Sequence, residues 1–253
     1  MRLVLLRHGE TDRNAADLFQ AQADIPLNPT GTRQAREVAR ALSPGAWAAV
    51  WSSPLVRADR TAAYAAERLG VPHHRADGLR ERDLGTLDGR ERAAYAREHP
   101  EEMRRLLTDP DYAPPGGETG RAALSRFAAT LRAVAAESRP PDPAGRPDPA
   151  RPARRPDPYP TRPVLVVTHG GVLNLLTRAL DGGPDAPPGV LVGTCAAACV
   201  DIAWTPDGRA LAALRRRNVP PHACEALDDA VLPPPSLALD DLVTTTPKEA
   251  TRT

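Results

Sequence analysis

An arginine and a histidine stand side by side near the start of the chain, directly after a short apolar run. Residues 5–10 read Leu-Leu-Arg-His-Gly-Glu, so Arg7 and His8 follow what we expect to be a buried strand. A guanidinium holds a phosphate group in a bidentate fork, and a neutral imidazole beside it can attack phosphorus. A lone histidine after a strand is usually an ordinary surface residue, so this interpretation depends on partners elsewhere in the chain.

Three later stretches supply the side chains that such chemistry needs. They contain Arg57, then Glu81, and finally His169, which stands in the sequence Thr-His-Gly-Gly. The carboxyl ends of parallel strands form one rim, where open α/β sheets bind their ligands, so we expect the three to converge there with His8. One imidazole would attack, the cations and the second imidazole would neutralise the phosphate oxygens, and the carboxyl group would protonate the leaving oxygen.

Alternating apolar segments must position these residues. We expect buried strands at residues 2–6, 48–51 and 164–168, helices at 32–42, 53–69 and 119–137, two short helices within 90–108 split by Pro100, and a helix from His169 through Leu180. Residues 195–204 and 210–214 flank Pro-Asp-Gly and predict a hairpin. The pattern is typical of a single α/β domain: a three-layer sandwich, with a mostly parallel central sheet and helices on both faces.

Turn and cap residues refine the helix boundaries. Ser53 and Pro54 predict the start of the second helix, with the serine as N-cap and the proline at the first position. Gly116 and Gly117 are not followed by Gly-Lys-Ser/Thr, so we expect a turn before the helix near Thr119 and not a nucleotide loop.

Composition divides the chain into three parts. We expect a catalytic domain at residues 1–216, interrupted by a mobile insertion at 139–163, where 10 of the 25 residues are proline and 6 are arginine. That stretch cannot bury enough apolar surface to offset its ordering entropy. Residues 217–253 have little periodicity and predict an extended or disordered C-terminal extension.

Bulk charge and apolar content exclude several classes of function. The chain has 253 residues with 33 basic and 32 acidic side chains, a net charge of +1, so we expect no nucleic-acid partner. Apolar runs are too short for a signal peptide or a membrane span, so we expect a cytoplasmic protein without membrane association. The three cysteines do not form a disulfide framework or a zinc site, and we expect Cys195 and Cys199 to be small buried hydrophobic residues.

The chain resembles the histidine phosphatase superfamily, in the phosphoglycerate-mutase-like branch that carries the Arg-His-Gly-Glu signature. The resemblance covers residues 1–222 apart from the insertion. It rests on that signature with Thr11 and Asn14, on residues 24–27 with Gly31, on 53–62, on 115–119 and on 218–222. Two positions depart from the family pattern: Ala21 stands where glycine is frequent, and Leu87 where tryptophan is frequent.

The resemblance implies a role for each candidate residue. His8 would be the phosphorylated nucleophile, and Glu81 would be the proton donor and then the base that activates water. The phosphate would be bound by Arg7, Asn14, Arg57, His169 and Gly170. The resemblance implies no metal and no cofactor, a small-molecule phosphate ester as substrate, and a possible homodimer.

Three functions are compatible with these residues. A phosphatase is favoured over a phosphoglycerate-type mutase, because such mutases typically follow the acid with His-Tyr and carry a longer lid, whereas Asp83 and Leu84 stand here. A silent binding domain is disfavoured because His8, Glu81 and His169 are all present. Sugar phosphates, phosphoglycerates, cofactor precursors and secondary-metabolite phosphates stay open as substrates.

The remaining histidines and arginines have plainer interpretations. We expect packing or solvent-exposed roles for His73, His74, His99 and His222, and solvated positions for most arginines between residues 90 and 105. Arg82 or Arg90 is the only weak candidate for a further contact with an anionic substrate.

Overall fold

The computed structural model describes residues 1–138, 162–182, 192–224 and 237–243. Within these residues the strands are β1 (Arg2–Arg7), β2 (Ala49–Ser52), β3 (His73–Arg75), β4 (Val164–Thr168), β5 (Ala197–Trp204), β6 (Ala210–Val219) and β7 (Leu237–Ala238). The helices are α1 (Asp12–Ala15), α2 (Pro29–Ala41), α3 (Val56–Leu69), α4 (Arg92–Glu98), α5 (Pro100–Thr108), α6 (Gly120–Glu137), α7 (Gly170–Gly182) and α8 (Leu239–Val243), with 3₁₀ turns at Asp77–Leu79, Gly85–Leu87 and Pro221–Cys224.

The seven strands form one mixed sheet in the order β3-β2-β4-β1-β5-β6-β7. The four strands from β3 to β1 are parallel, and β5, β6 and β7 add antiparallel neighbours on the other side of β1. In the register of β1 with β4, Arg7 lies opposite Thr168, so both strands end at the same level. The residues that follow them, His8 and His169, therefore emerge at one edge of the sheet.

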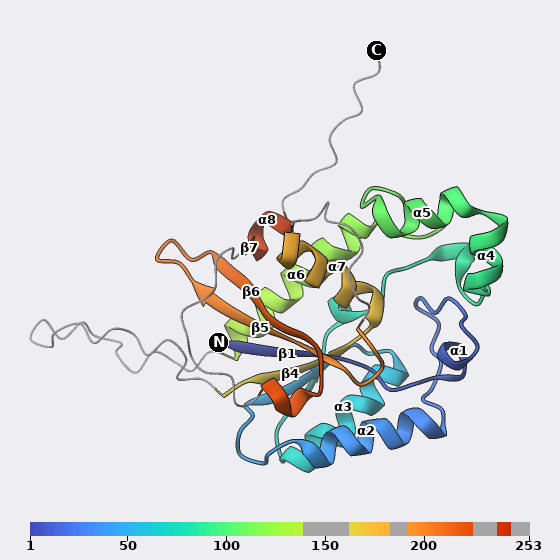
Figure 1. Ribbon diagram of the computed structural model, residues 1–253. Coiled ribbons are helices and arrows are strands. Elements are labelled where there is room, and N and C mark those ends of the chain that lie inside the picture. Colours follow the sequence, from blue (N-terminus) through green and yellow to red (C-terminus); the bar gives the residue numbers. More distant parts are fainter. Residues whose placement is uncertain (139–161, 183–191, 225–236, 244–253) are drawn as a thin grey trace, which may run out of the picture.

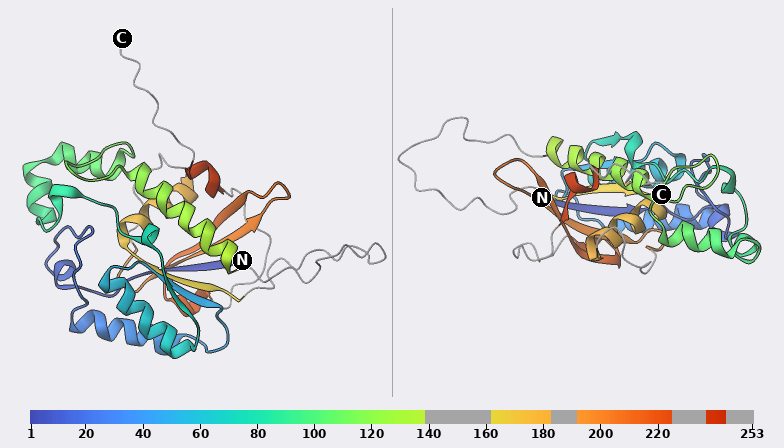
Figure 2. Two further views of the ribbon diagram at one scale, coloured as in Figure 1. Left: turned by 180° about the vertical axis from the view of Figure 1, so that it is seen from behind. Right: turned by 90° about the horizontal axis from the view of Figure 1, so that it is seen from above.

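Helices cover both faces of the sheet, as expected for a three-layer sandwich (Figures 1 and 2). Side chains alternate along β1, so Leu3 and Leu5 pack into the core under α6, α7 and α8. Val4 and Leu6 point to the opposite face and pack against α3 and the chain around α2. Because both faces are covered, the central strands carry continuous apolar runs at residues 3–6 and 164–167, which made them visible in the sequence.

The expected start of α3 is wrong. The helix begins at Val56, with Leu55 as an N-cap that makes no side-chain cap hydrogen bond. The Ser53 hydroxyl instead lies 2.8 Å from Nε2 of His169 and accepts a weak bond from the Leu55 amide. A side chain drawn away by a tertiary partner cannot cap the helix, and sequence spacing does not reveal that competition.

A third, smaller apolar cluster lies outside the two sheet cores. It joins the segment after α1 to the short helices α4 and α5, through Phe19, Leu84, Leu87 and Tyr95 with Met103 and Leu106 against them. α4 ends at Glu98 and α5 begins at Pro100. This confirms two short helices separated at this proline. Figure 1 shows α1, α4 and α5 beyond the carboxyl end of β1.

The C-terminal part differs from the expected extended tail where it is described. β6 runs to Val219 and not to residue 214, and residues 237–243 form β7 and α8. Leu239 and Leu242 of α8 are buried in the core beside α6. The insertion at 139–161, and residues 225–236 and 244–253 of the expected tail, lie outside the described residues.

The cysteines also differ in part from expectation. Cys199 is fully buried, as expected, but it is disulfide-bonded. Cys195 is a free thiol, only partly buried as a residue, with a positive φ of 54°. Burial raises the pKa of the Cys195 thiol to about 12, so it is not a reactive thiolate. Among the described residues, no helix is long and apolar enough to cross a membrane.

Candidate active site

His8 lies directly after β1 and is almost completely buried. Its Nδ1 is 2.7 Å from the carbonyl oxygen of Gly9. A carbonyl can only accept, so Nδ1 carries the proton and Nε2 keeps its lone pair. Thr61 fixes the backbone after His8, because its hydroxyl accepts a hydrogen bond from the Gly9 amide at 3.2 Å. The residue after the strand is thus an imidazole in a single tautomer whose Nε2 is unprotonated.

The surroundings of His8 keep its ring neutral. Burial first, and then the nearby charges of Arg57 and Arg7, hold the pKa of His8 well below its usual value of 6.5. Each of these effects disfavours a positive charge on the ring. A ring that stays neutral is the form that can act as a nucleophile.

Arg57 reaches the same place from the first turn of α3 and is fully buried. Its Nε donates to Nε2 of His8 at 3.2 Å, and its two terminal nitrogens donate to the carbonyls of Ala23 and Ala21 at 2.7 and 2.8 Å. Burial lowers the pKa of Arg57 to about 10, which leaves it cationic at neutral pH. Ala21 and Leu87 are the two positions that depart from the family pattern. Ala21 binds Arg57 through its backbone carbonyl, and Leu87 is a buried packing residue.

Arg7, the last residue of β1, places a second guanidinium beside His8. Its Nη1 donates to the carbonyl of Val192 at 2.9 Å, whereas the buried Nε has no hydrogen-bond partner in the described part of the chain. Burial lowers the pKa of Arg7, and the charge of Glu81 opposes that shift. A buried cation with an orphaned N–H is suited to receive an anion.

His169 follows β4 and brings the second imidazole to the site. Its ring centroid lies 5.1 Å from that of His8, at an interplanar angle of 61°. Nε2 is bonded to Ser53, and the buried Nδ1 has no partner within the described residues. Burial, followed by the charge of Arg57, holds the pKa of His169 well below 6.5. A phosphate oxygen beside His8 would satisfy this orphaned nitrogen.

Glu81 is held at the N-terminus of α7. Its Oε2 accepts from the amide of Gly171 at 2.7 Å, and its Oε1 accepts from the amides of Val172 and Arg82 at 3.0 and 2.8 Å. These N–H groups and the positive end of the helix dipole stabilise a negative carboxylate. A Cβ at Gly171 would lie 2.4 Å from Oε1, so only glycine lets the carboxylate sit here.

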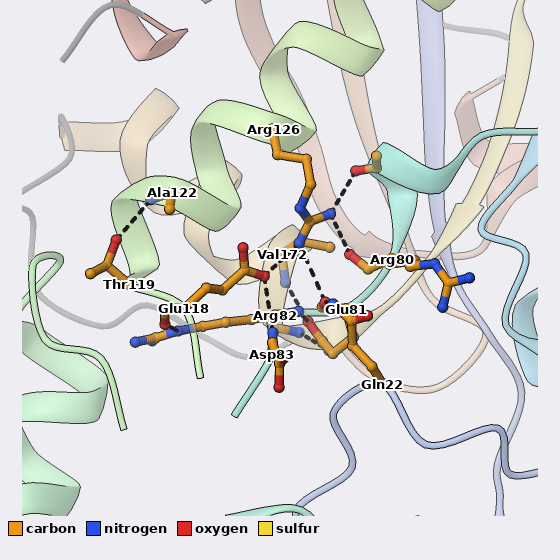
Figure 3. A network of polar contacts seen from close by, with 12 residues as sticks. Gln22, Arg80, Glu81, Arg82, Asp83, Glu118, Thr119, Ala122, Arg126 and Val172 are labelled. Carbon is orange, nitrogen blue, oxygen red and sulfur yellow. Dashed lines mark hydrogen bonds and ion pairs between the residues drawn. The ribbon is translucent and has the colours of Figure 1, made fainter. Parts of the chain in front are cut away.

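Arg126 and Glu118 fix the chain segment that carries Glu81 (Figure 3). Arg126 Nη1 donates to the carbonyls of Gly78 and Arg80 at 2.9 and 3.0 Å, and its Nη2 pairs with Glu118 at 2.6 Å. Glu118 in turn accepts from the amide of Asp83 at 2.9 Å. The segment has no regular secondary structure around Glu81, so these side chains replace the missing backbone ladder.

The candidate residues line or back one cavity of about 320 Å³. Arg7, His8, Asn14, Glu81 and Gly170 lie in its wall. The Asn14 side-chain oxygen accepts from the backbone and hydroxyl of Thr11, so only its NH₂ group is suited to a phosphate oxygen. Arg57 and His169 are fully buried immediately behind His8 and do not form part of the open wall. All of the expected site residues are thereby brought to one end of the sheet.

The two weaker arginine candidates are engaged elsewhere. Arg82 lines the cavity, but its guanidinium donates to the carbonyls of Glu118, Leu106 and Tyr112. Arg90 lies outside the cavity wall and pairs with Glu98 near the surface.

The remaining histidines have the packing roles expected of them. His73 is bonded to Ser52, and His74 stacks on Trp51 on the exposed side of β3.

Sequence reasoning missed several residues that shape the site. They are Ser53, Thr61, Gly171 and Arg126. The sequence pattern predicts a helix N-cap at Ser53 and includes Gly171 only as part of the Thr-His-Gly-Gly stretch. Thr61 was visible only as part of the family pattern, and Arg126 looked like one more charge on a helix. None had a local signal for its role, because each acts on a residue distant in sequence.

The arrangement contains the chemical groups that phosphoryl transfer through a histidine requires. It combines a neutral imidazole whose Nε2 is unprotonated with two guanidiniums, a second imidazole and a carboxylate, in or directly beside one cavity. Within the described residues, no cluster of three or more His, Cys, Asp or Glu side chains could hold a metal ion.

Comparison with known proteins agrees with this geometry. A family model described as the histidine phosphatase superfamily (branch 1) matches residues 3–142. A phosphatase of Bacillus subtilis, named PhoE and described as uncharacterized, is 31% identical over 194 residues, 76% of this chain and 84% of its own length. A 2,3-bisphosphoglycerate-dependent phosphoglycerate mutase of Treponema pallidum is 35% identical over 147 residues, which are 56% of this chain and 59% of the mutase.

Solved structures include a mycobacterial glucosyl-3-phosphoglycerate phosphatase in complex with VO3. It superimposes with a TM-score of 0.69 at 28% sequence identity and covers 86% of this chain and 98% of its own. Sequence and structure thus point to the same group of proteins.

Proposed function

The chain belongs to branch 1 of the histidine phosphatase superfamily and hydrolyses phosphate esters, and we propose that it does so through a phosphoryl group carried on His8. The substrate is a small-molecule phosphate monoester. The same residues serve both half-reactions, with Arg7, Asn14, Arg57, His169 and Gly170 around the phosphate.

In the first half-reaction, Nε2 of His8 attacks phosphorus and the P–O bond to the alcohol breaks. Glu81 gives its proton to the departing oxygen, so the alcohol leaves neutral. The resulting carboxylate is stabilised by the amides of Gly171 and Val172 at the N-terminus of α7. Arg7 and Arg57 neutralise charge on the phosphate oxygens during the transfer.

In the second half-reaction, water attacks the phosphorus atom of phospho-His8. Glu81, now a carboxylate, accepts a proton from that water, and the N–P bond breaks to return neutral His8 and inorganic phosphate. The phosphate release leaves Glu81 protonated for the next turnover.

The single observation that supports this proposal most is the bond from Nδ1 of His8 to the Gly9 carbonyl. It fixes the tautomer in which Nε2 is the nucleophile, and the buried cations around it keep that nitrogen unprotonated. A histidine that served only packing would gain nothing from two adjacent guanidiniums, which disfavour its charged form.

The test is His8→Ala, assayed with a phosphate monoester labelled with ³²P. We expect turnover to fall by at least about 10⁴-fold and acid-labile labelling of the protein to disappear. His74→Ala is the matched control, because His74 lies on β3 and stacks only on Trp51; it should keep both signals. Substantial turnover by the His8→Ala variant would show that another group is the nucleophile.

A mutase shares the first half-reaction, and one relative carries that name. Adding a second alcohol to the assay separates the two activities, since a mutase moves the phosphoryl group to the alcohol and a phosphatase releases inorganic phosphate.

We also propose that the enzyme acts in the cytoplasm and can form a homodimer. Sedimentation of the full chain tests the dimer.

A further inference from the structure

The wall of the cavity opposite the phosphate-binding residues carries a group of large apolar side chains. Leu18, Phe19, Leu84, Met103, Leu106 and Leu175 line it, from the segment after α1, from α5 and from α7. Four of these residues belong to, or pack against, the small apolar cluster that joins α4 and α5 to the rest of the molecule. The leaving group of a bound ester must lie against this wall, because the opposite end holds the phosphate.

Two cations in this part of the cavity are already engaged. Arg82 donates to three backbone carbonyls, and Arg178 donates to those of Leu107 and Thr108 at 2.8 and 3.2 Å. Both side chains are buried, and the buried Nε of Arg178 has no hydrogen-bond partner among the described residues. The terminal N–H groups of both arginines hold α5 in place, so only the Nε of Arg178 stays available to a carboxylate or second phosphate on the substrate.

Two further polar side chains of the wall, Arg92 and Asn174, also have partners. Arg92 stacks over the ring of Phe19 at 5.0 Å and faces Asp17 at 3.8 Å, so its charge is matched at the rim. The Asn174 side-chain oxygen accepts from the amide of Val192 at 3.0 Å. A sugar or polyol hydroxyl would therefore meet few free partners at Arg82, Arg92 and the Asn174 side-chain oxygen.

The mouth of the cavity continues the apolar surface. Leu107 lines the cavity and keeps 45% of its surface exposed, although large hydrophobic side chains elsewhere in the described chain are mostly buried. It lies next to Leu106 at the C-terminal end of α5. An apolar group too long for the cavity would continue over Leu107 and cover it.

We propose that the substrate is the phosphate ester of an alcohol with an apolar body, an alkyl or aromatic group, and not of a polyhydroxylated or second anionic compound. The proposal rests on the proposed phosphatase function, because it assigns the leaving-group side of the same cavity. The residues at the phosphate end bind the phosphate group of the ester. Specificity for the alcohol part comes from hydrocarbon contact with α5 and the segment after α1.

The test measures binding, so it does not depend on turnover. Calorimetry with methyl-, butyl- and hexylphosphonate, which cannot be hydrolysed, gives a dissociation constant for each chain length. We expect about a two- to fourfold tighter Kd for each methylene added between butyl and hexyl, as burial of hydrocarbon requires. The 6-hydroxyhexyl and 5-carboxypentyl analogues should bind at least about tenfold more weakly than hexylphosphonate.

Variants locate the effect on the wall. Leu106→Asn should flatten the chain-length series while leaving the Kd of methylphosphonate unchanged. Arg104→Gln is the control, because Arg104 lies on α5 but pairs with Glu101 at the surface; it should leave the whole series unchanged. The series on the unaltered protein decides the question even if Leu106→Asn does not fold.

Each outcome has a distinct meaning. A flat series, or a preference for the hydroxyl or carboxylate analogue, overturns the proposal, and the carboxylate preference would assign Arg92 or Arg178 to a second anion. A steep series in a protein that fails to hydrolyse hexyl phosphate would keep the apolar wall and remove the proposed function. Hydrolysis of alkyl phosphates, with a Kd that does not depend on chain length, would support the proposed function and contradict the apolar wall.

Discussion

The two ends of the cavity are built in different ways. At the phosphate end, His8 and His169 follow neighbouring parallel strands, and Glu81 is held by backbone amides of α7. At the leaving-group end, the wall comes from short helices and a loop, joined to the domain by arginines that donate to backbone carbonyls. Figure 1 shows the second region projecting beyond the sheet edge that carries the first.

The difference explains why one end is visible in the sequence and the other is not. Strand ends that share a register bring the following residues together whatever the side chains of the lid are. The lid has no such frame, so its contacts can change without disturbing the chemistry. Chemistry and specificity are therefore separable in this molecule, and three experiments examine that separation.

The largest expected effect is at the phosphate end, from Gly171→Ala. A Cβ at this position would come within 2.4 Å of the Glu81 carboxylate and displace it. We expect the variant to reproduce Glu81→Gln: a loss of roughly 10²–10⁴-fold in kcat/KM on an alkyl phosphate, but a far smaller loss on 4-nitrophenyl phosphate, whose leaving group needs little protonation. Steady-state kinetics with both esters measures it.

Gly193→Ala is the matched control for this change. A Cβ at Gly193 would meet its nearest neighbour at 3.5 Å, an ordinary contact. The control should retain activity on both esters. Equal losses on the two esters in Gly171→Ala would mean that the glycine supports the fold and not the proton transfer.

A smaller effect is expected at the leaving-group end, from Arg82→Met. Its loss leaves three carbonyls without their donor, so the free energy of unfolding should fall by about 1–3 kcal/mol. KM for hexyl phosphate should rise, but the inhibition constant of inorganic phosphate should not change. Arg90→Met, which breaks a surface pair with Glu98, should shift stability by less than about 0.5 kcal/mol. A weaker inhibition by phosphate in Arg82→Met would show that the two ends are coupled.

The smallest effect concerns the pH dependence of stability. The pKa of His8 is well below 6.5 in the folded chain, so below pH 6.5 the unfolded chain binds a proton that the folded chain does not. Stability therefore falls as pH decreases through 6.5. His8→Gln should remove about 1 kcal/mol of the loss between pH 6.5 and 5.5, as measured by urea unfolding at each pH. An unchanged pH dependence would contradict a neutral His8.

Much of the fold could be predicted because its signals are local. The strand at 164–168 is apolar up to its last residue and occurs as predicted, and Pro100 separates two helices as predicted. Other features could not be predicted because they depend on distant partners. Ser53 reads as a helix cap in sequence, yet its hydroxyl is bonded to His169, 116 residues away.

The C-terminal part gives a second example of the same limit. Residues 237–243 have weak periodicity, and only contact with β6 and α6 makes them ordered. The site divides in the same way: the types of residue at Arg7, His8 and Glu81 were readable, but the tautomer of His8 was not.

The amino-acid sequence by itself determined which chemical groups are present and the order of the strands and helices that carry them, since apolar periodicity and turn residues act over a few positions. Only the tertiary structure decided that His8 is neutral with Nε2 unprotonated, that Glu81 sits on the N-terminus of α7, and that large apolar side chains gather on the opposite wall. These properties depend on burial and on partners brought close through the fold, and neither burial nor proximity in space is a local property of the chain.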